Sequence, residues 1–227
     1  MFSILGHEFA DAGYFINLAH RTDRLEKVLE QVEKYKIKGL TRFEGIISGE
    51  YAGCGMSHVE IIKEAKAKGY RSVAIFEDDF YIMPTLKKGL NDQTEVSFDD
   101  TWRSVAQSLQ ALDYWDAFYF GGRLSAPTYL TSAMHLVKLT EKCFCAHALI
   151  IRDTLYDTII NEWSYAKEDQ IDHYYGVKLQ KRFEFLLAAP MLINHGDAGA
   201  NFSDLLKRDM SYHNWLLNSY DEFVYNT

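Results

Sequence analysis

The sequence predicts an α/β protein with a mostly parallel central sheet flanked by helices. Two observations predict this class. Short β-prone apolar runs alternate with segments of helical periodicity between residues 13 and 76, which is the pattern of consecutive βαβ units. The chain of 227 residues is 48% hydrophobic and contains only 3 prolines, so it has enough apolar material for the core of one domain.

The first unit is a strand followed by a helix. Residues 13–18 form a short apolar run typical of a strand. Thr22 or Asp23 can cap the following helix by accepting a backbone N–H, and Gly39 can end it in a left-handed conformation. Within this segment, apolar residues recur at helical spacing at Leu25, Val28, Leu29, Val32 and Tyr35.

The same pattern then repeats. We expect a strand over residues 41–48, a helix over residues 56–68 that stops at Gly69, and a strand over residues 72–76. Ligands of such sheets bind beyond the carboxyl ends of the strands. Two of these ends are followed by polar side chains, namely Asn17 and the run Glu77, Asp78 and Asp79.

The rest of the chain continues the alternation less regularly. We expect a helix over residues 102–112, a strand over 116–120, loops and short strands over 121–140, a buried strand over 143–151, a helix over 154–163, a helix from near Glu168 and a strand over 185–193. No linker-like stretch interrupts these elements, so the sequence predicts a single domain.

Charge and composition argue against several classes of protein. The net charge of -8 repels a nucleic-acid backbone, and no basic run offers a phosphate-binding stripe. The opening residues lack the basic start and apolar stretch of a signal peptide, and no segment reaches about 18 consecutive apolar residues. We therefore expect a soluble, cytoplasmic protein without a membrane span. Cys54, Cys143 and Cys145 are too few for a disulfide scaffold and are expected to be free thiols.

Three consecutive carboxylates follow the predicted strand at residues 72–76. Like charges at such short range cost free energy unless a cation or solvent relieves them. Oxygen ligands suit Mg²⁺ or Mn²⁺, and the alternation of a strand would place Glu77 and Asp79 on one side, unless the chain turns at once. The competing interpretation is a solvated acidic turn with no ligand.

Two further segments carry candidate binding residues. Arg21 can pair with a phosphate through two N–H donors, and Asn17 can bind a base or ribose; alternatively, Arg21 belongs to an ordinary helix start. The segment from Gly53 to His58 joins glycines to a helix N-terminus, where free N–H groups favour anions. His58 can equally cap or pack.

Together these segments resemble the ordered motifs of the family 25 glycosyltransferases, which include lipooligosaccharide and collagen galactosyltransferases. The resemblance covers roughly the first third of the chain. It rests on Ile16, Asn17, Leu18, Arg21, Asp23 and Arg24, then Gly53, Cys54, Ser57 and His58, then Ile75, Phe76, Glu77, Asp78 and Asp79.

This resemblance implies a Rossmann-like, GT-A-type fold with a nucleotide-binding half over residues 12–122 and an acceptor and catalytic half over residues 123–227. It also implies a nucleotide-diphosphate sugar donor, by preference linked to UDP, and Mn²⁺ or Mg²⁺ as cofactor. The donor-binding residues would be Asn17, Leu18, Arg21, Arg24, Ser57, His58, Glu77 and Asp78.

An inverting transfer to a glycan or other hydroxyl acceptor needs a base. The acidic residues near the helix expected from Glu168 suggest Asp169, with Asp172 as the second candidate. The helix dipole also favours carboxylates at such a position without any catalysis. By analogy with GT-A enzymes, His195 would complete the metal shell with Glu77 and Asp79.

The sequence thus predicts a metal-dependent glycosyltransferase. One alternative is a metal-dependent phosphohydrolase or nucleotidyltransferase, in which the acidic triplet activates water or a phosphate. Another is a nucleotide-sugar-binding module that is catalytically silent.

Overall fold

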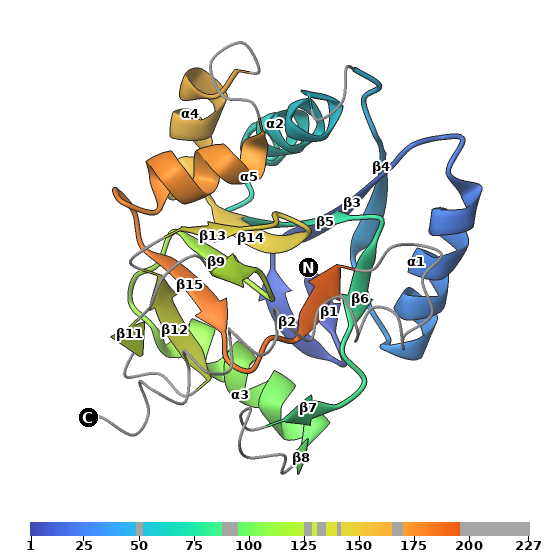
Figure 1. The fold of residues 1–227 in the computed structure, drawn as a ribbon, viewed down its shortest axis with the longest axis vertical. Coiled ribbons are helices and arrows are strands. Elements are labelled where there is room, and N and C mark those ends of the chain that lie inside the picture. The colour runs from blue at the N-terminus through green and yellow to red at the C-terminus, as the bar shows by residue number, and fades with distance from the viewer. Residues whose placement is uncertain are drawn as a thin grey trace.

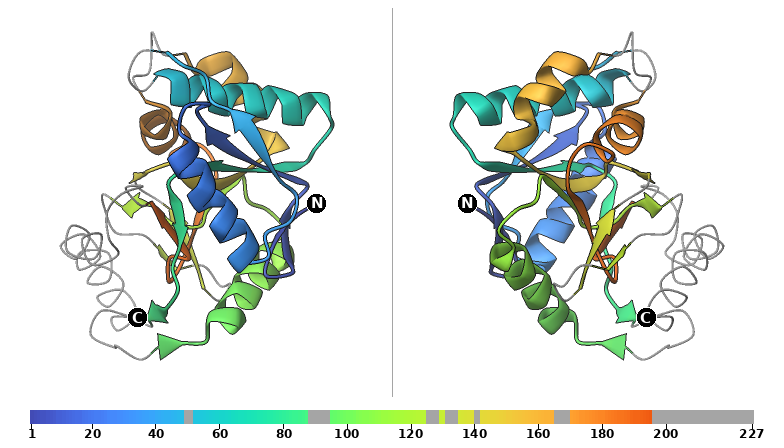
Figure 2. Two further views of the ribbon diagram at one scale, coloured as in Figure 1. Left: turned by 90° about the vertical axis from the view of Figure 1, so that its right-hand side faces the viewer. Right: turned by 90° about the vertical axis from the view of Figure 1, so that its left-hand side faces the viewer.

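A computed structural model describes residues 1–48, 52–87, 95–124, 129–130, 135–139, 142–164 and 170–195. It has three layers (Figures 1 and 2). Helices α2 (Ala52–Ala67), α4 (Asp153–Glu162) and α5 (Ile171–Tyr174) lie above a central sheet. Helices α1 (Thr22–Lys34) and α3 (Phe98–Ala111) lie below it, together with the hairpin of β1 (Phe2–Ile4) and β2 (His7–Ala10). The α/β class with helices on both faces of a sheet is confirmed. Among these residues no helix combines the length and the apolar composition needed to cross a membrane.

Helices α2, α3 and α4 end within one residue of their predicted ends, but α2 begins at Ala52 rather than residue 56, and α3 begins at Phe98 rather than residue 102. Helix α5 continues into a π-helical turn (Tyr175–Leu179). The predicted caps of α1 are wrong. Thr22 and Asp23 lie inside its first turn, and the helix ends at Lys34, before Gly39.

The central sheet has eight strands in the described part of the chain. Their order is β11 (Tyr129–Leu130), β12 (Leu136–Leu139), β15 (Phe185–Ala188), β9 (Ala117–Tyr119), β14 (Ala148–Arg152), β5 (Ser72–Glu77), β3 (Ala12–Asn17) and β4 (Leu40–Glu44). Strands β4, β3 and β5 are parallel, as expected for βαβαβ. In the rest of the sheet the expectation of a mostly parallel arrangement is wrong. Strand β14 runs antiparallel to both β5 and β9. Strand β12 runs antiparallel to both β15 and β11.

Four two-stranded pairs surround this sheet. They are β1 (Phe2–Ile4) with β2 (His7–Ala10), β6 (Phe80–Ile82) with β16 (Ile193–His195), β7 (Leu86–Lys87) with β8 (Glu95–Val96), and β10 (Arg123–Leu124) with β13 (Cys143–Phe144). The β6–β16 pair joins the segment after β5 to the segment after β15.

Two predicted strands are each split. The strand expected over residues 143–151 breaks at Cys145, whose φ of 69° lies in the left-handed region, so β13 and β14 are separate. The strand expected over residues 185–193 ends at Ala188, and Ile193 starts β16 in a different sheet.

The sheet separates two apolar cores. Ala74 and Phe76 of β5 pack with the hairpin and α3 on one face, whereas Val73 and Ile75 pack with α2 and α4 on the other. This alternation is the two-residue period of a strand that is buried on both sides. It anchors β5 so that the residues after Glu77 emerge at a defined edge of the sheet.

The glycines at the start of α2 allow close packing. A Cβ on Gly53 would lie 2.1 Å from the carbonyl oxygen of Ile46, and one on Gly55 would lie 2.3 Å from the Trp163 ring. These approaches explain why glycine occurs here. The first turns of α2 can therefore pack closely against the loop after β4 and against Trp163 at the end of α4.

Replacing Gly55 by alanine is expected to destabilise the protein by about 2 kcal/mol, because overpacking against a buried ring outweighs the roughly 1 kcal/mol by which alanine is favoured in a helix. Urea unfolding would measure the loss. Trp163→Phe serves as the matched partner, since the smaller ring makes room for the new methyl group. The double variant should be less destabilised than the sum of the two single variants, and simple additivity would contradict the packing account.

Candidate functional site

The acidic triplet lies where β5 ends. Glu77 is the last residue of the strand, Asp78 and Asp79 form a turn, and Phe80 begins β6. The strand alternation therefore stops at Glu77, and the chain turns at once.

Asp78 is the centre of a buried polar network that joins β3, α1 and the turn. The Nδ2 group of Asn17 donates to one carboxylate oxygen of Asp78 at 2.7 Å, and Nη1 of Arg24 donates to the other at 2.7 Å. Asn17 is only 1% exposed and Asp78 only 8%. Because charge-assisted hydrogen bonds of this kind are strong when shielded from water, the network holds the turn against the carboxyl end of β3.

Asp79 is less well compensated. Its Oδ2 lies 3.4 Å from Nη1 of Arg24, which Asp78 already shares. Its Oδ1 is buried and has no hydrogen-bond partner within the described residues. Burial, together with the negative charge of Glu77, raises the pKa of Asp79 to about 7, although Arg24 opposes the shift. This corner of the site therefore has an excess of negative charge that a cation would relieve.

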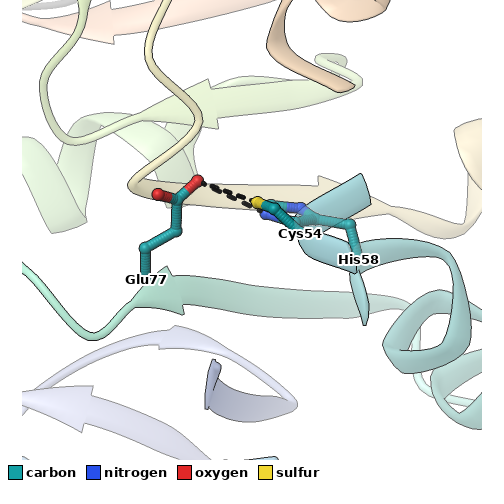
Figure 3. Close-up of side chains that lie close together, drawn as sticks. All are labelled: Cys54, His58 and Glu77. Atoms are coloured by element: carbon teal, nitrogen blue, oxygen red, sulfur yellow. Dashed lines mark hydrogen bonds and ion pairs between the residues drawn. The ribbon is translucent and has the colours of Figure 1, made fainter. Parts of the chain in front are cut away.

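Glu77 points toward α2 and meets Cys54 and His58 (Figure 3). The Cys54 thiol lies 3.4 Å from Oε1 of Glu77, and Nε2 of His58 lies 3.9 Å from the same oxygen. Burial alone would raise the pKa of Glu77, but the interaction with His58, helped by His147 and Cys54, outweighs it and leaves the pKa lowered. Burial and Glu77 raise the pKa of the Cys54 thiol well above its ordinary value.

Two histidines lie beside the same turn. His195 pairs with Phe80 across β16 and β6, which places it next to the residue that follows Asp79. Its ring packs edge-on against His147 with centroids 5.5 Å apart, and the carbonyl of His147 accepts the N–H of Glu77. Burial and His195 lower the pKa of His147 to about 4, so this imidazole is neutral at pH 7.

The other predicted donor-binding residues are placed around this centre. Arg21 is partly exposed and forms a two-pronged ion pair with Asp23, which lowers the pKa of Asp23 to about 2. Leu18, also partly exposed, follows Asn17 and accepts the Arg21 N–H through its carbonyl. The Ser57 hydroxyl is buried, accepts the N–H of Ile46 and donates to the helix backbone, so it holds the loop before α2.

Of the two candidate bases, only Asp172 lies within the described residues. Asp172 lies in the first turn of α5. Its Oδ2 accepts the backbone N–H of Cys145, the residue of positive φ between β13 and β14, at 3.1 Å. Asp169 lies outside the described residues. The carboxylate of Asp172 thus has a structural contact whatever its chemical role.

Sequence reasoning missed Cys54 and His147 as neighbours of the site. The signal for Cys54 was present, because Cys54 and His58 are four residues apart and share one face of α2. No comparable signal marks His147, which reaches the site because β14 lies antiparallel to β5. None of the three cysteines forms a disulfide, in agreement with the prediction.

No protein-family model matches the chain. No curated protein matches it in sequence. Similar solved structures include A197 from STIV, at 11% identity and a TM-score of 0.46, covering 82% of this chain and 86% of that one. Another is a glycosyltransferase involved in the glycosylation of the major capsid of PBCV-1, at 11% identity and a TM-score of 0.48, covering 88% and 98%. A third is a nucleoside-diphosphate-sugar pyrophosphorylase from Vibrio cholerae RC9, at 14% identity and a TM-score of 0.40, covering 87% and 81%. At these identities and TM-scores the likenesses carry no argument about what this chain does.

Proposed function

We propose that this chain is a metal-dependent glycosyltransferase that moves a hexose from a nucleotide-diphosphate sugar to a glycan or other hydroxyl acceptor. The observation that carries the proposal is the acidic turn at the carboxyl end of β5. Three consecutive carboxylates follow one another there beside the end of β3, and a buried oxygen of Asp79 has no partner among the described residues. Ligands of α/β sheets bind at such an edge.

Asp79 would be the first ligand of a hard divalent cation such as Mn²⁺ or Mg²⁺, because its buried oxygen has no partner among the described residues. Asp79 and Glu77 would supply oxygen ligands, and His195 would approach from β16. The bound metal would neutralise the charge that builds on the departing diphosphate. Asp78 already bonds Asn17 and Arg24, so its part is to hold the turn in place.

The donor would lie along the edge formed by β3 and the start of α1. Leu18 and Arg21 are partly exposed there, and Arg21 can exchange its ion pair with Asp23 for a phosphate. Ser57 would act indirectly, through the loop that its hydroxyl holds. His58 would act through its contact with Glu77. UDP is the nucleotide that we test first.

During transfer the acceptor oxygen bonds to the anomeric carbon as the bond from that carbon to the diphosphate breaks. The hydroxyl proton passes to a carboxylate, which we assign to Asp169 with Asp172 as the second candidate. Attack opposite the leaving group inverts the configuration. We place donor binding in residues 12–122 and acceptor binding in residues 123–227 of one domain.

Thermal unfolding tests the proposal. The protein would be heated with UDP, GDP, their hexose conjugates and inorganic phosphate, each with Mn²⁺ or with a chelator. A ligand that binds only the folded state raises the midpoint by an amount set by its concentration relative to Kd. We expect a metal-dependent rise with one nucleotide family.

The outcomes separate the alternatives. A rise with inorganic phosphate alone would favour a phosphohydrolase. A rise with nucleotide sugars but no transfer or donor cleavage would favour a silent binding module. No rise with any nucleotide, in folded protein, would overturn the donor site.

A further inference from the structure

A second cluster of metal-binding atoms lies next to the acidic turn. Cys54 and His58 occupy successive turns of α2, and their side chains point at Glu77 at the end of β5 (Figure 3). One ligand atom from each residue lies within 4.8 Å of the others. Sulfur, nitrogen and oxygen thus meet at one point, in contrast to the oxygen-rich corner formed by Asp79.

The separations suit a tetrahedral ion. Bonds of about 2.3 Å to sulfur and about 2.0 Å to nitrogen and oxygen put tetrahedral ligands roughly 3.3–3.6 Å apart. The thiol and Glu77 Oε1 are 3.4 Å apart, and His58 Nε2 and the same oxygen are 3.9 Å apart. The thiol and the imidazole nitrogen lie within 4.8 Å of each other, so side-chain movements of about 1 Å would bring the three atoms to tetrahedral separations.

His58 gives a second, independent indication. Its side chain is fully buried, yet neither ring nitrogen has a hydrogen-bond partner among the described residues. Leaving a buried polar group unpaired costs about 1–3 kcal/mol. The edge-on contact with the Tyr175 ring, with centroids 6.1 Å apart, explains the packing of the imidazole but satisfies neither nitrogen. Nε2 lies 3.9 Å from Glu77 Oε1, within ion-pair range but too far to hydrogen-bond, and a metal ion between the two would bind the lone pair of Nε2.

We propose that Cys54, His58 and Glu77 bind a borderline-soft divalent cation of the Zn²⁺ type, with water as the fourth ligand. Thiolate and imidazole select such ions over Mg²⁺ and Mn²⁺. Binding releases the thiol proton of Cys54 to solvent. Glu77 belongs both to this site and to the proposed Mn²⁺ site. A zinc ion bound here would therefore remove one ligand from the Mn²⁺ site. The zinc site itself does not depend on the proposed transferase activity.

Cobalt substitution tests this site without any measurement of turnover. Co²⁺ would be titrated into the reduced, metal-free protein, and absorption spectra recorded. We expect a thiolate-to-cobalt charge-transfer band in the near ultraviolet, intense visible bands typical of tetrahedral cobalt, and loss of both on addition of one equivalent of Zn²⁺.

Matched variants identify the ligands. Cys54→Ser should abolish the charge-transfer band, whereas Cys145→Ser, which changes another partly exposed thiol, should keep it. Asp79→Asn should also keep the band, which separates this site from the Mn²⁺ site. Because His58 is buried, His58→Gln would be scored only after its circular dichroism matches the parent. Absence of the band in the parent protein, or its persistence in Cys54→Ser, would overturn the proposal.

Discussion

Asp79→Asn is expected to abolish metal-dependent donor binding and to lower transfer on the order of 10³-fold, because a metal ligand that assists a leaving group contributes several kcal/mol. The fold should survive, since Asp78 keeps its own bonds to Asn17 and Arg24. Calorimetric titration of Mn²⁺ with a nucleotide diphosphate, and an initial-rate assay, would measure the two losses. Unchanged metal affinity would remove Asp79 from the proposed site.

The same variant should gain stability when metal is absent. The pKa of Asp79 is raised to about 7, so the protonated carboxyl favours the folded state, and this contribution is lost as pH rises from about 4 through 7. At pH 8 the free energy of unfolding of metal-free Asp79→Asn, measured in urea, should therefore exceed that of the parent by about 1–2 kcal/mol. Near pH 4 the two free energies should be equal.

A control separates this effect from the general effect of removing a charge. Asp157→Asn removes an exposed carboxylate of α4 that pairs with Lys66, and it should change neither metal binding nor the pH dependence of stability. The neutral His147 contributes stability that is present above its ordinary pKa and lost as pH falls toward 4. The contribution of His147 is the same in the parent, Asp79→Asn and Asp157→Asn, so it cancels when their stabilities are compared.

The sequence predicted the first half of the fold well because hydrophobic periodicity is strong there. Strands β3 and β5 and the ends that carry Asn17 and Glu77 lie within two residues of their predicted positions. Periodicity says nothing about strand direction, however. Strand β14 is as apolar as a parallel strand because both of its faces are buried, and only tertiary pairing reveals that it runs antiparallel.

The candidate site divides in the same way. Asp78 bonds Asn17 and Arg24, and Asp79 is left with uncompensated negative charge nearby. This difference depends on the turn after Glu77, which strand alternation does not predict. The approach of Cys54 to Glu77 depends on how α2 packs on its neighbours, which include Trp163 against Gly55. Such features follow from packing between elements far apart in the sequence.

Asp169→Asn is expected to lower transfer by roughly 10²-fold or more while leaving Mn²⁺ and donor binding unchanged, because removing a general base affects only the proton transfer. Asp172→Asn is expected to lower it less than about tenfold. An asparagine at position 172 keeps an oxygen that can accept the Cys145 N–H, so it removes the charge and preserves the contact.

The pH dependence of the transfer rate distinguishes a carboxylate that acts as the base from one that only supports the structure. If Asp169 is the base, the acidic limb of the parent rate profile, which reports ionisation of that base, should disappear in Asp169→Asn and persist in Asp172→Asn. The opposite pattern would move the base to Asp172, whose carboxylate lies at the start of α5. If both variants keep the limb and the parent rate, neither carboxylate takes the proton, and the base must be sought elsewhere along the sheet edge.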